Sequence, residues 1–315
     1  MDYKYIKEYS DYILIENVKN FNLKQTFECG QCFRFKKISD NNYIIVAFER
    51  VIELEEDGNN IKVYNSNMED IENIWIKYFD LERDYSSIKE KLSEDDLLRK
   101  SIEFGPGIRI LNQDPFEILI SFIVSARNSI PSIMKTINKI SAKWGREIEY
   151  KGNIYNAFPT IEQIKDATLE EIQETGASFR SKYIIDTISN IYNSFEAKRE
   201  GNLEKIEEFK KYDLEYIKSL NDDECHAALQ EFKGVGAKVA DCVMLFSMEK
   251  YSAFPVDVWV KRAMIYFYGA KDESLNKIRV FARNKFKDLS GFAQQYLFYY
   301  ARENKITIDW SFYYK

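Results

Sequence analysis

The sequence has little material for a metal site, with four cysteines and a single histidine in 315 residues. Cys29 and Cys32 have the spacing of half a zinc or redox motif, but Cys225 and Cys242 do not form a second pair with matching spacing. We therefore expect no metal site. Free thiols in a reducing cytoplasm fit the four cysteines.

Long apolar runs are also lacking. No uninterrupted apolar stretch approaches the ~18 residues of a membrane helix, and residues 1–12 are charged rather than signal-like. We expect no contact with a membrane and a location in the cytoplasm, associated with the nucleoid in a bacterium. The net charge of −6 argues mildly against a protein that coats nucleic acid without specificity.

The remaining composition is that of a globular chain, and 315 residues are enough for about two domains with cores of their own. Short β-rich runs separated by turn residues occupy residues 12–65, and helical spacing dominates from Met68 onward. A sheet followed by helices indicates an α+β fold. We predict an N-terminal antiparallel sheet domain, residues 1–100, and a helical domain with two subdomains, residues 101–315.

The stretch from Asp223 to Arg262 predicts two helices joined by a glycine hairpin, then a loop that ends in an acid. Gly234 and Gly236 are expected to take positive φ values and to let another backbone approach closely. The helix that follows begins with unpaired N–H groups, which form a site for an anion such as a DNA phosphate. An ordinary tight turn between two helices explains the spacing equally well.

Lys238 and Asp257 are the candidate catalytic residues. Lys238 lies in the first turn after the hairpin, where the helix dipole disfavours the charged amine and favours a nucleophile. Asp257 is predicted to cap a helix that starts at Val258, and a carboxylate in that position could also stabilise a cation or relay protons. An amine and a carboxylate placed in this way suit covalent catalysis through an imine.

This stretch resembles the helix-hairpin-helix, Gly/Pro-Asp motif of base-excision DNA glycosylases, on residues 229–243 (LQEFKGVGAKVADCV) and 254–259 (FPVDVW). The hairpin alone recurs in DNA binders without catalytic activity. The lysine and the downstream Pro-Val-Asp are typical of the bifunctional glycosylase/lyase branch, in which the lysine attacks the sugar. The resemblance implies no redox or nucleotide cofactor, and it implies DNA contacts at Gly234, Gly236 and Lys261.

Four further segments resemble 8-oxoguanine DNA glycosylases: residues 29–35 (CGQCFRF), 107–115 (GIRILNQDP), 178–182 (SFRSK) and 291–298 (GFAQQYLF). The family reads the N7 hydrogen of the oxidised base with a glycine carbonyl, reads the base edge with a glutamine, and holds the base between a phenylalanine and a cysteine. The resemblance assigns the carbonyl to Gly30 and the reading of the base edge to Gln294. It assigns the two positions that hold the base to Phe298 and Cys242.

These residues also have simpler interpretations. Taken alone, Gly30 is equally well explained as a turn into a strand, whereas Phe298 is better explained as a core residue and Gln294 as a surface residue. The spacing of four between Gln294 and Phe298 places them on one helix face, as the wall of a pocket requires.

The resemblance also places four residues at the DNA gap left by the flipped base: Arg127, Asn128, Phe179 and Arg180. Asn128 matches the asparagine-rich segment of the family, whereas Arg127 and Ser129 depart from it. Ser132 stands where animal members have an arginine that reads the opposite cytosine. A relaxed choice of opposite base is therefore expected.

The sequence thus predicts a monomeric base-excision-repair enzyme that removes 8-oxoguanine from double-stranded DNA through a lysine Schiff base and then cuts the strand by β-elimination. One alternative keeps the fold and acts on another oxidised or alkylated purine. The other is a helix-hairpin-helix DNA-binding protein without catalytic activity.

Overall fold

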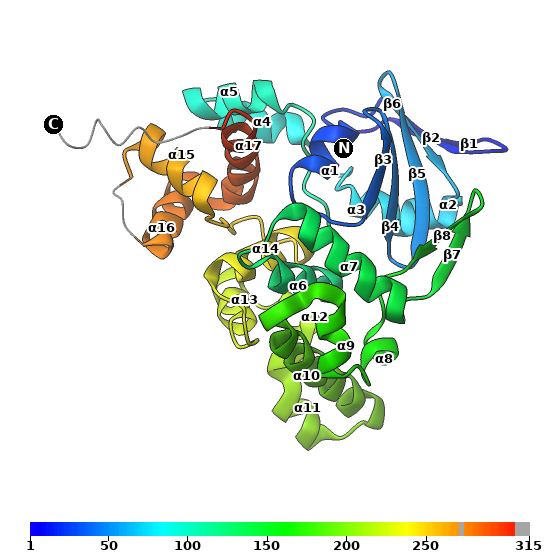
Figure 1. The fold of residues 1–315 in the computed structure, drawn as a ribbon. Coiled ribbons are helices and arrows are strands. Elements are labelled where there is room, and N and C mark those ends of the chain that lie inside the picture. The colour runs from blue at the N-terminus through cyan, green and yellow to red at the C-terminus, as the bar shows by residue number, and fades with distance from the viewer. Residues whose placement is uncertain (271–273, 306–315) are drawn as a thin grey trace.

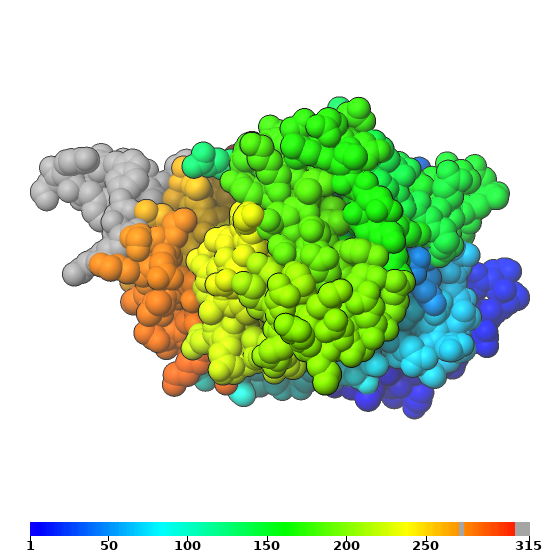
Figure 2. Space-filling view, turned by 90° about the horizontal axis from the view of Figure 1, so that it is seen from below, coloured from blue at the N-terminus to red at the C-terminus, as the bar shows by residue number. Residues whose placement is uncertain are grey.

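The computed structural model describes residues 1–270 and 274–305. An antiparallel sheet lies at one side and helices form the rest of the molecule (Figure 1), so the predicted α+β fold is confirmed. In a view from below, helices α10 to α13, green to yellow, separate the blue sheet region from α15 and α16, in orange (Figure 2). No helix in the described ranges is long and apolar enough to cross a bilayer.

The sheet has the strand order β1-β2-β6-β5-β4-β3, and neighbouring strands are antiparallel. Its strands are β1 (Tyr5–Glu8), β2 (Ile13–Glu16), β3 (Phe35–Ser39), β4 (Asn42–Ala47), β5 (Arg50–Asp57) and β6 (Asn60–Tyr64). Strand β1 was not predicted, because its short sequence YIKE is mostly exposed and has no apolar face. Strand β3 begins at Phe35, and residues 32–34 belong to the loop after α1.

Helix α1 (Leu23–Glu28) precedes the loop that carries Gly30. The fully buried amide of Gln31 holds this loop in place: Nε2 donates to the carbonyls of Thr26 at 2.9 Å and Arg109 at 2.7 Å, and Oε1 accepts from the N–H of Leu111 at 2.9 Å. A buried amide with both ends bonded has one orientation. The Gly30 backbone is therefore fixed against residues 109–111.

The helices that follow the sheet begin near residue 68. They are α2 (Met68–Asp70), α3 (Ile76–Tyr78), α4 (Tyr85–Leu92), α5 (Asp96–Phe104), α6 (Pro115–Ser125), α7 (Ile130–Trp144), α8 (Ile161–Ile164), α9 (Leu169–Ile172), α10 (Ser181–Glu200), α11 (Leu203–Phe209) and α12 (Leu214–Ser219). The chain continues with α13 (Asp222–Leu229), α14 (Ala237–Ser247), α15 (Val258–Tyr268), α16 (Leu275–Phe286) and α17 (Ser290–Glu303). An unpredicted hairpin, β7 (Glu147–Tyr150) and β8 (Asn153–Asn156), follows α7.

Helices α6 and α14 form the centre of the helical core. Asp114 caps α6 by accepting from the N–H of Glu117 at 2.9 Å, and Pro115 takes its first position. Phe122 of α6 stacks on Phe246 of α14 with ring centroids 5.6 Å apart. Phe246 is the second-last residue of α14, so this packing holds the end of α6 against the end of α14.

Helices α4 and α5 contribute to the same core as the later helices. Their buried side chains cluster with those of α14 and α17, although α4 lies within residues 1–100 and α5 begins there. The domain boundary near residue 100 stays a prediction. The end of the predicted second domain, residues 306–315, lies outside the described residues.

Candidate active site and DNA-binding groove

The predicted hairpin joins α13 to α14. Gly234 has φ +84°, and a Cβ there would meet the Tyr183 ring at 2.5 Å, so both conformation and packing require glycine. Gly236 has φ −97° and ψ 179°, which any residue adopts, so the expected positive φ is wrong at this position. A Cβ at Gly236 would meet no described atom within 4 Å.

Lys238 is the second residue of α14 and is half-buried. Its ammonium lies 5.0 Å from the centroid of the Phe122 ring, a cation–π contact that holds the side chain over α6. Cys242 lies one turn further on and is 2% exposed. Burial raises the pKa of the Cys242 thiol to about 11, against the opposing charge of Lys238. The thiol is therefore neutral and a weak nucleophile.

Asp257 caps α15, as predicted, and its Oδ1 accepts from the N–H of Val260 at 2.8 Å. Burial raises the pKa of Asp257, while the Val260 N–H and the charge of Lys238 act in the opposite direction. The carboxylate is thus held by a helix start with its charge close to the amine.

Two spaces meet at these residues. The groove, as we call the first, has a volume of about 750 Å³ and is lined by Lys238, Asp257 and the hairpin glycines, and by Arg127 and Asn128 from the end of α6. The inner pocket has a volume of about 50 Å³ and is lined by Gly30, Phe122, Lys238, Cys242, Phe246, Pro255, Asp257, Gln294, Gln295 and Phe298. Lys238 and Asp257 line both spaces, so they stand at the junction between the groove and the inner pocket.

The inner pocket brings together all four predicted base-recognition residues. Gly30 has φ +85°, and a Cβ there would lie 3.4 Å from both the Phe298 ring and the Arg302 guanidinium. Gly30 therefore meets two requirements, a turn with positive φ and close contact with the side chains of Phe298 and Arg302. Gln294 is 4% exposed and donates to the Pro255 carbonyl at 3.1 Å, so the interpretation of Gln294 as a surface residue is wrong.

The sequence did not predict some residues of this region: Phe122, Pro255, Gln295 and Arg302. Arg302 donates to the Glu28 carbonyl at 2.6 Å and so ties α17 to the end of α1 beside Gly30. A pattern in the sequence indicates Arg302: Gln294, Phe298 and Arg302 are spaced four residues apart and so lie on one helix face. Phe122 carried no such signal, since its helix is nearly all apolar.

Phe179 and Arg180 line neither space. Phe179 is 54% exposed, and the Arg180 guanidinium lies 4.4 Å from its ring centroid. Arg180 itself is buried and donates to the carbonyls of Ala126, at 2.8 Å, and Arg127, at 3.1 Å. Arg180 thus holds the loop that carries Arg127 and Asn128. Lys261, one turn after Asp257 in α15, also lies outside both spaces.

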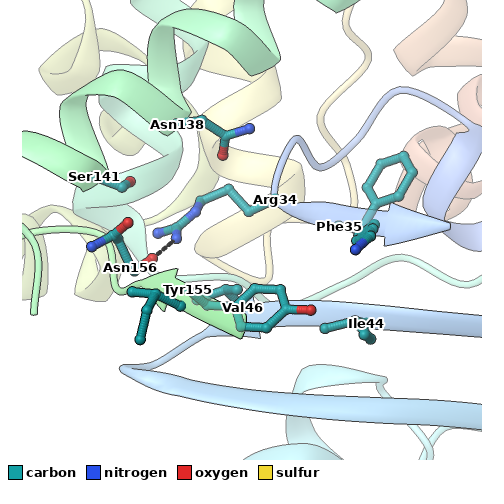
Figure 3. A pocket seen from close by; sticks show the side chains of 10 residues that line it. Arg34, Phe35, Ile44, Val46, Asn138, Ser141, Tyr155 and Asn156 are labelled. Carbon is teal, nitrogen blue, oxygen red and sulfur yellow. Dashed lines mark hydrogen bonds between the residues drawn. The ribbon is translucent and has the colours of Figure 1, made fainter. Parts of the chain in front are cut away.

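A separate hollow of about 380 Å³ lies where β3, β4, α7 and β8 meet. Arg34 points toward Asn156 and donates to its carbonyl (Figure 3). Glu117, whose pKa burial raises to about 7, lies 3.9 Å from the Arg34 guanidinium. None of the candidate catalytic or base-recognition residues lines this hollow.

Two family models match the chain. The N-terminal domain of 8-oxoguanine DNA glycosylase matches residues 13–119, and the HhH-GPD superfamily of base excision DNA repair proteins matches residues 120–289. The chain is 30% identical over 242 residues to a probable N-glycosylase/DNA lyase of Methanothermobacter thermautotrophicus, which covers 75% of each chain. It is also 30% identical over 249 residues to an N-glycosylase/DNA lyase of Arabidopsis thaliana, covering 76% of this chain and 64% of the plant protein.

A solved structure agrees with these matches. The Clostridium acetobutylicum 8-oxoguanine glycosylase/lyase, in complex with double-stranded DNA containing cytosine opposite 8-oxoguanine, is 56% identical. It superposes with a TM-score of 0.90 over 97% of this chain and 100% of that one. The chain therefore belongs to the HhH-GPD superfamily of base excision DNA repair proteins and carries the N-terminal domain of the 8-oxoguanine DNA glycosylases, as its motifs predicted.

Proposed function

We propose that the chain excises 8-oxoguanine from double-stranded DNA with Lys238 as the nucleophile and then cuts the strand at the abasic site. The observation that carries the proposal is the position of Lys238 and Asp257, which line both an open groove and an inner pocket with base-recognition residues. The relatives named as N-glycosylase/DNA lyase and 8-oxoguanine glycosylase/lyase support a bifunctional enzyme.

The groove is the proposed path of the damaged strand. The N–H groups at the start of α14 face a phosphate, and the open space beside Gly236 lets the DNA backbone approach. Turning the lesion out of the stack costs a few kcal/mol. Exposed Phe179 and the loop with Arg127 and Asn128 fill the resulting gap. Lys261 lies near the DNA backbone from the first turn of α15.

In the chemical step, Lys238 attacks C1′ of the sugar as a free amine. The bond from C1′ to the base breaks, and its electrons leave with the base, which takes up a proton. Asp257 stabilises the positive charge that develops on the sugar. The product opens to a Schiff base, and loss of a proton from C2′ then expels the 3′ phosphate. Cys242, a neutral thiol, forms a wall of the site and takes no proton.

The inner pocket is the proposed site of the flipped base. The Gly30 carbonyl accepts from N7–H, a hydrogen that guanine lacks, while Phe298 and Cys242 pack on the two faces of the ring. Gln294 contacts the Watson–Crick edge. The Phe298 ring lies against Gly30 in this structure and leaves only about 50 Å³. Phe298 must therefore move as the base enters.

We further propose that the enzyme acts as a monomer in the cytoplasm, makes no contact with a membrane and uses no dissociable cofactor. The proposed substrate is a duplex, and the groove supplies a single set of catalytic residues from one chain.

Borohydride trapping tests the function directly. The protein should form a covalent adduct with a duplex that carries 8-oxoguanine, because borohydride reduces the Schiff base. A non-catalytic DNA binder would form none. In parallel, one preparation is tested on 8-oxoguanine, 3-methyladenine and hypoxanthine duplexes. Faster excision of either alkylated or deaminated base than of 8-oxoguanine would contradict the proposed substrate.

A further inference from the structure

We propose that Gln295 is a specificity-determining residue whose side-chain oxygen accepts a hydrogen bond from the N2 amino group of the flipped base. The inference rests on the proposed function and extends it. Gly30 distinguishes oxidised from normal guanine, whereas Gln295 distinguishes a guanine-type base from one that lacks the amino group.

The Pro255 carbonyl fixes the polarity of two side-chain amides. A carbonyl oxygen can only accept, so Gln294 turns Nε2 toward Pro255, at 3.1 Å. The Oε1 of Gln294 then accepts from Nε2 of Gln295, at 2.9 Å. Each amide orientation follows from its partner, which is how such orientations are assigned. The free end of this chain of amides is therefore the oxygen of Gln295.

That oxygen is buried and has no hydrogen-bond partner in residues 1–270 and 274–305. Gln295 is 3% exposed and lines the inner pocket beside Gln294 and Phe298. A buried amide oxygen without a partner destabilises a protein relative to a bonded one, so such groups are rare in native structures. A donor that arrives with the base would satisfy it.

The two amides match the Watson–Crick edge of guanine. That edge presents O6 as an acceptor, followed by N1–H and the N2 amino group as donors. Gln294 has a second N–H and a remaining lone pair on Oε1, and Gln295 adds its oxygen. These atoms form the order donor (Gln294 N–H), acceptor (Gln294 Oε1) and acceptor (Gln295 Oε1), which complements O6, N1–H and the N2 amino group of guanine. Adenine presents its N6 amino group as a donor and N1 as an acceptor, so donor would meet donor and acceptor would meet acceptor at the two Gln294 positions.

The test compares 8-oxo-2′-deoxyguanosine with 8-oxo-2′-deoxyinosine, which differs only by lacking the N2 amino group. Single-turnover excision is measured for both in the same duplex. The parent should excise the inosine analogue about tenfold more slowly, the effect of one buried hydrogen bond. In Gln295→Met, which keeps the side-chain length but removes the acceptor, the ratio of the two rates should fall toward one.

Phe298→Ala is the matched control. It removes the stacking that both substrates share and leaves the chain of amides in place, so it should slow both and keep the parental ratio. A purely structural role of Gln295 would also slow both equally. Equal rates for the two substrates in the parent, or an unchanged ratio in Gln295→Met, would overturn the inference.

Gln295→Met could fail to fold, and a second measurement covers that case. A crystal structure of Lys238→Gln with an 8-oxoguanine duplex should place N2 of the base within about 3.2 Å of Oε1 of Gln295. A longer distance, or a water bonded to that oxygen instead, would refute the assignment. If the parent does not excise 8-oxoguanine at all, the proposed function fails, and this inference with it.

Discussion

The groove and the inner pocket differ in how they are assembled. The groove is lined mainly by residues 125–128 and 234–259, with a contribution from residues 275–279. The inner pocket takes its lining from places as distant as residues 30, 122 and 298. The residues proposed for chemistry and DNA-backbone binding thus lie largely in one motif, whereas those proposed for recognition of the base are brought together by long-range packing.

The two spaces also differ in volume. The groove has about 750 Å³, whereas the inner pocket, with the Phe298 ring as one of its walls, has about 50 Å³. Substitutions in the groove should change the affinity for any DNA. Substitutions in the inner pocket should change the recognition and excision of the lesion. Those at the junction should affect every step.

The largest effect is expected at the junction. Lys238→Gln should abolish the borohydride adduct and lower excision by on the order of 10³-fold or more, because no amine remains to form the Schiff base. The control is Lys233→Gln, an exposed hairpin lysine that pairs with Asp186 and lines neither space. It should still form the adduct. If Lys238→Gln folds, binds DNA and forms as much adduct as the parent, the assignment of Lys238 is wrong.

The second effect concerns the charge at the junction. Because burial raises the pKa of Asp257, this carboxyl takes up a proton at a higher pH than a free carboxyl does. Excision should therefore fall as the pH is lowered through that raised value, since the sugar cation loses its counter-charge. Asp257→Asn should be about 10²-fold slower at neutral pH and should lack this acid limb.

Single-turnover rates across the acid range measure the limb in both proteins. An acid limb of the same shape in Asp257→Asn would assign it to another group.

Phe298→Ala separates the inner pocket from the junction. Stacking of a base on an aromatic ring is worth about 1–3 kcal/mol, so excision and lesion affinity should fall accordingly. Cleavage of a preformed abasic site needs no base to be held and should change much less. If both activities fall by the same factor, Phe298 has a structural role and the base lies elsewhere.

Two glycines provide a matched pair, one from each space. Gly30 has φ +85° and faces Phe298, so Gly30→Ala should cost about 1–2 kcal/mol of stability and slow excision of 8-oxoguanine. Gly236 has φ −97° and open space around it, so Gly236→Ala should shift stability by less than about 1 kcal/mol. It should instead weaken binding to damaged and undamaged DNA alike, because the new methyl group meets the DNA backbone.

Thermal unfolding and DNA titration measure both variants. Lesion-specific loss in Gly236→Ala, or equal excision of guanine and 8-oxoguanine by the parent, would remove the contrast between these glycines.

The sequence was informative where neighbouring residues carry the signal. The α+β order and the cap of α15 follow from local patterns, and the structure confirms them. The two hairpin glycines look alike in sequence. Their difference comes from Tyr183, which packs on Gly234 and lies far away along the chain.

Tertiary contacts also explain the other differences. Gln294 is buried because the Pro255 carbonyl offers a partner, and no local pattern could show that contact. The strands β1, β7 and β8 have four residues each and few buried positions, so their periodicity is too short to detect.

The smallest effect concerns the base opposite the lesion. Arg127, Ser129 and Ser132 replace the set that reads cytosine in the animal enzymes, so single-turnover excision should differ little among the four opposite bases. Ser132 is exposed in the first turn of α7, and Ser132→Arg should raise the preference for cytosine by about 1–3 kcal/mol, the worth of one bidentate contact.

Asn138→Arg is the control, because it adds the same charge further along α7, beside the separate hollow, and should raise no such preference. A cytosine preference of several hundredfold or more in the parent would show that other residues read the opposite base, and the groove would then share the lesion-level selectivity that we assign to the inner pocket.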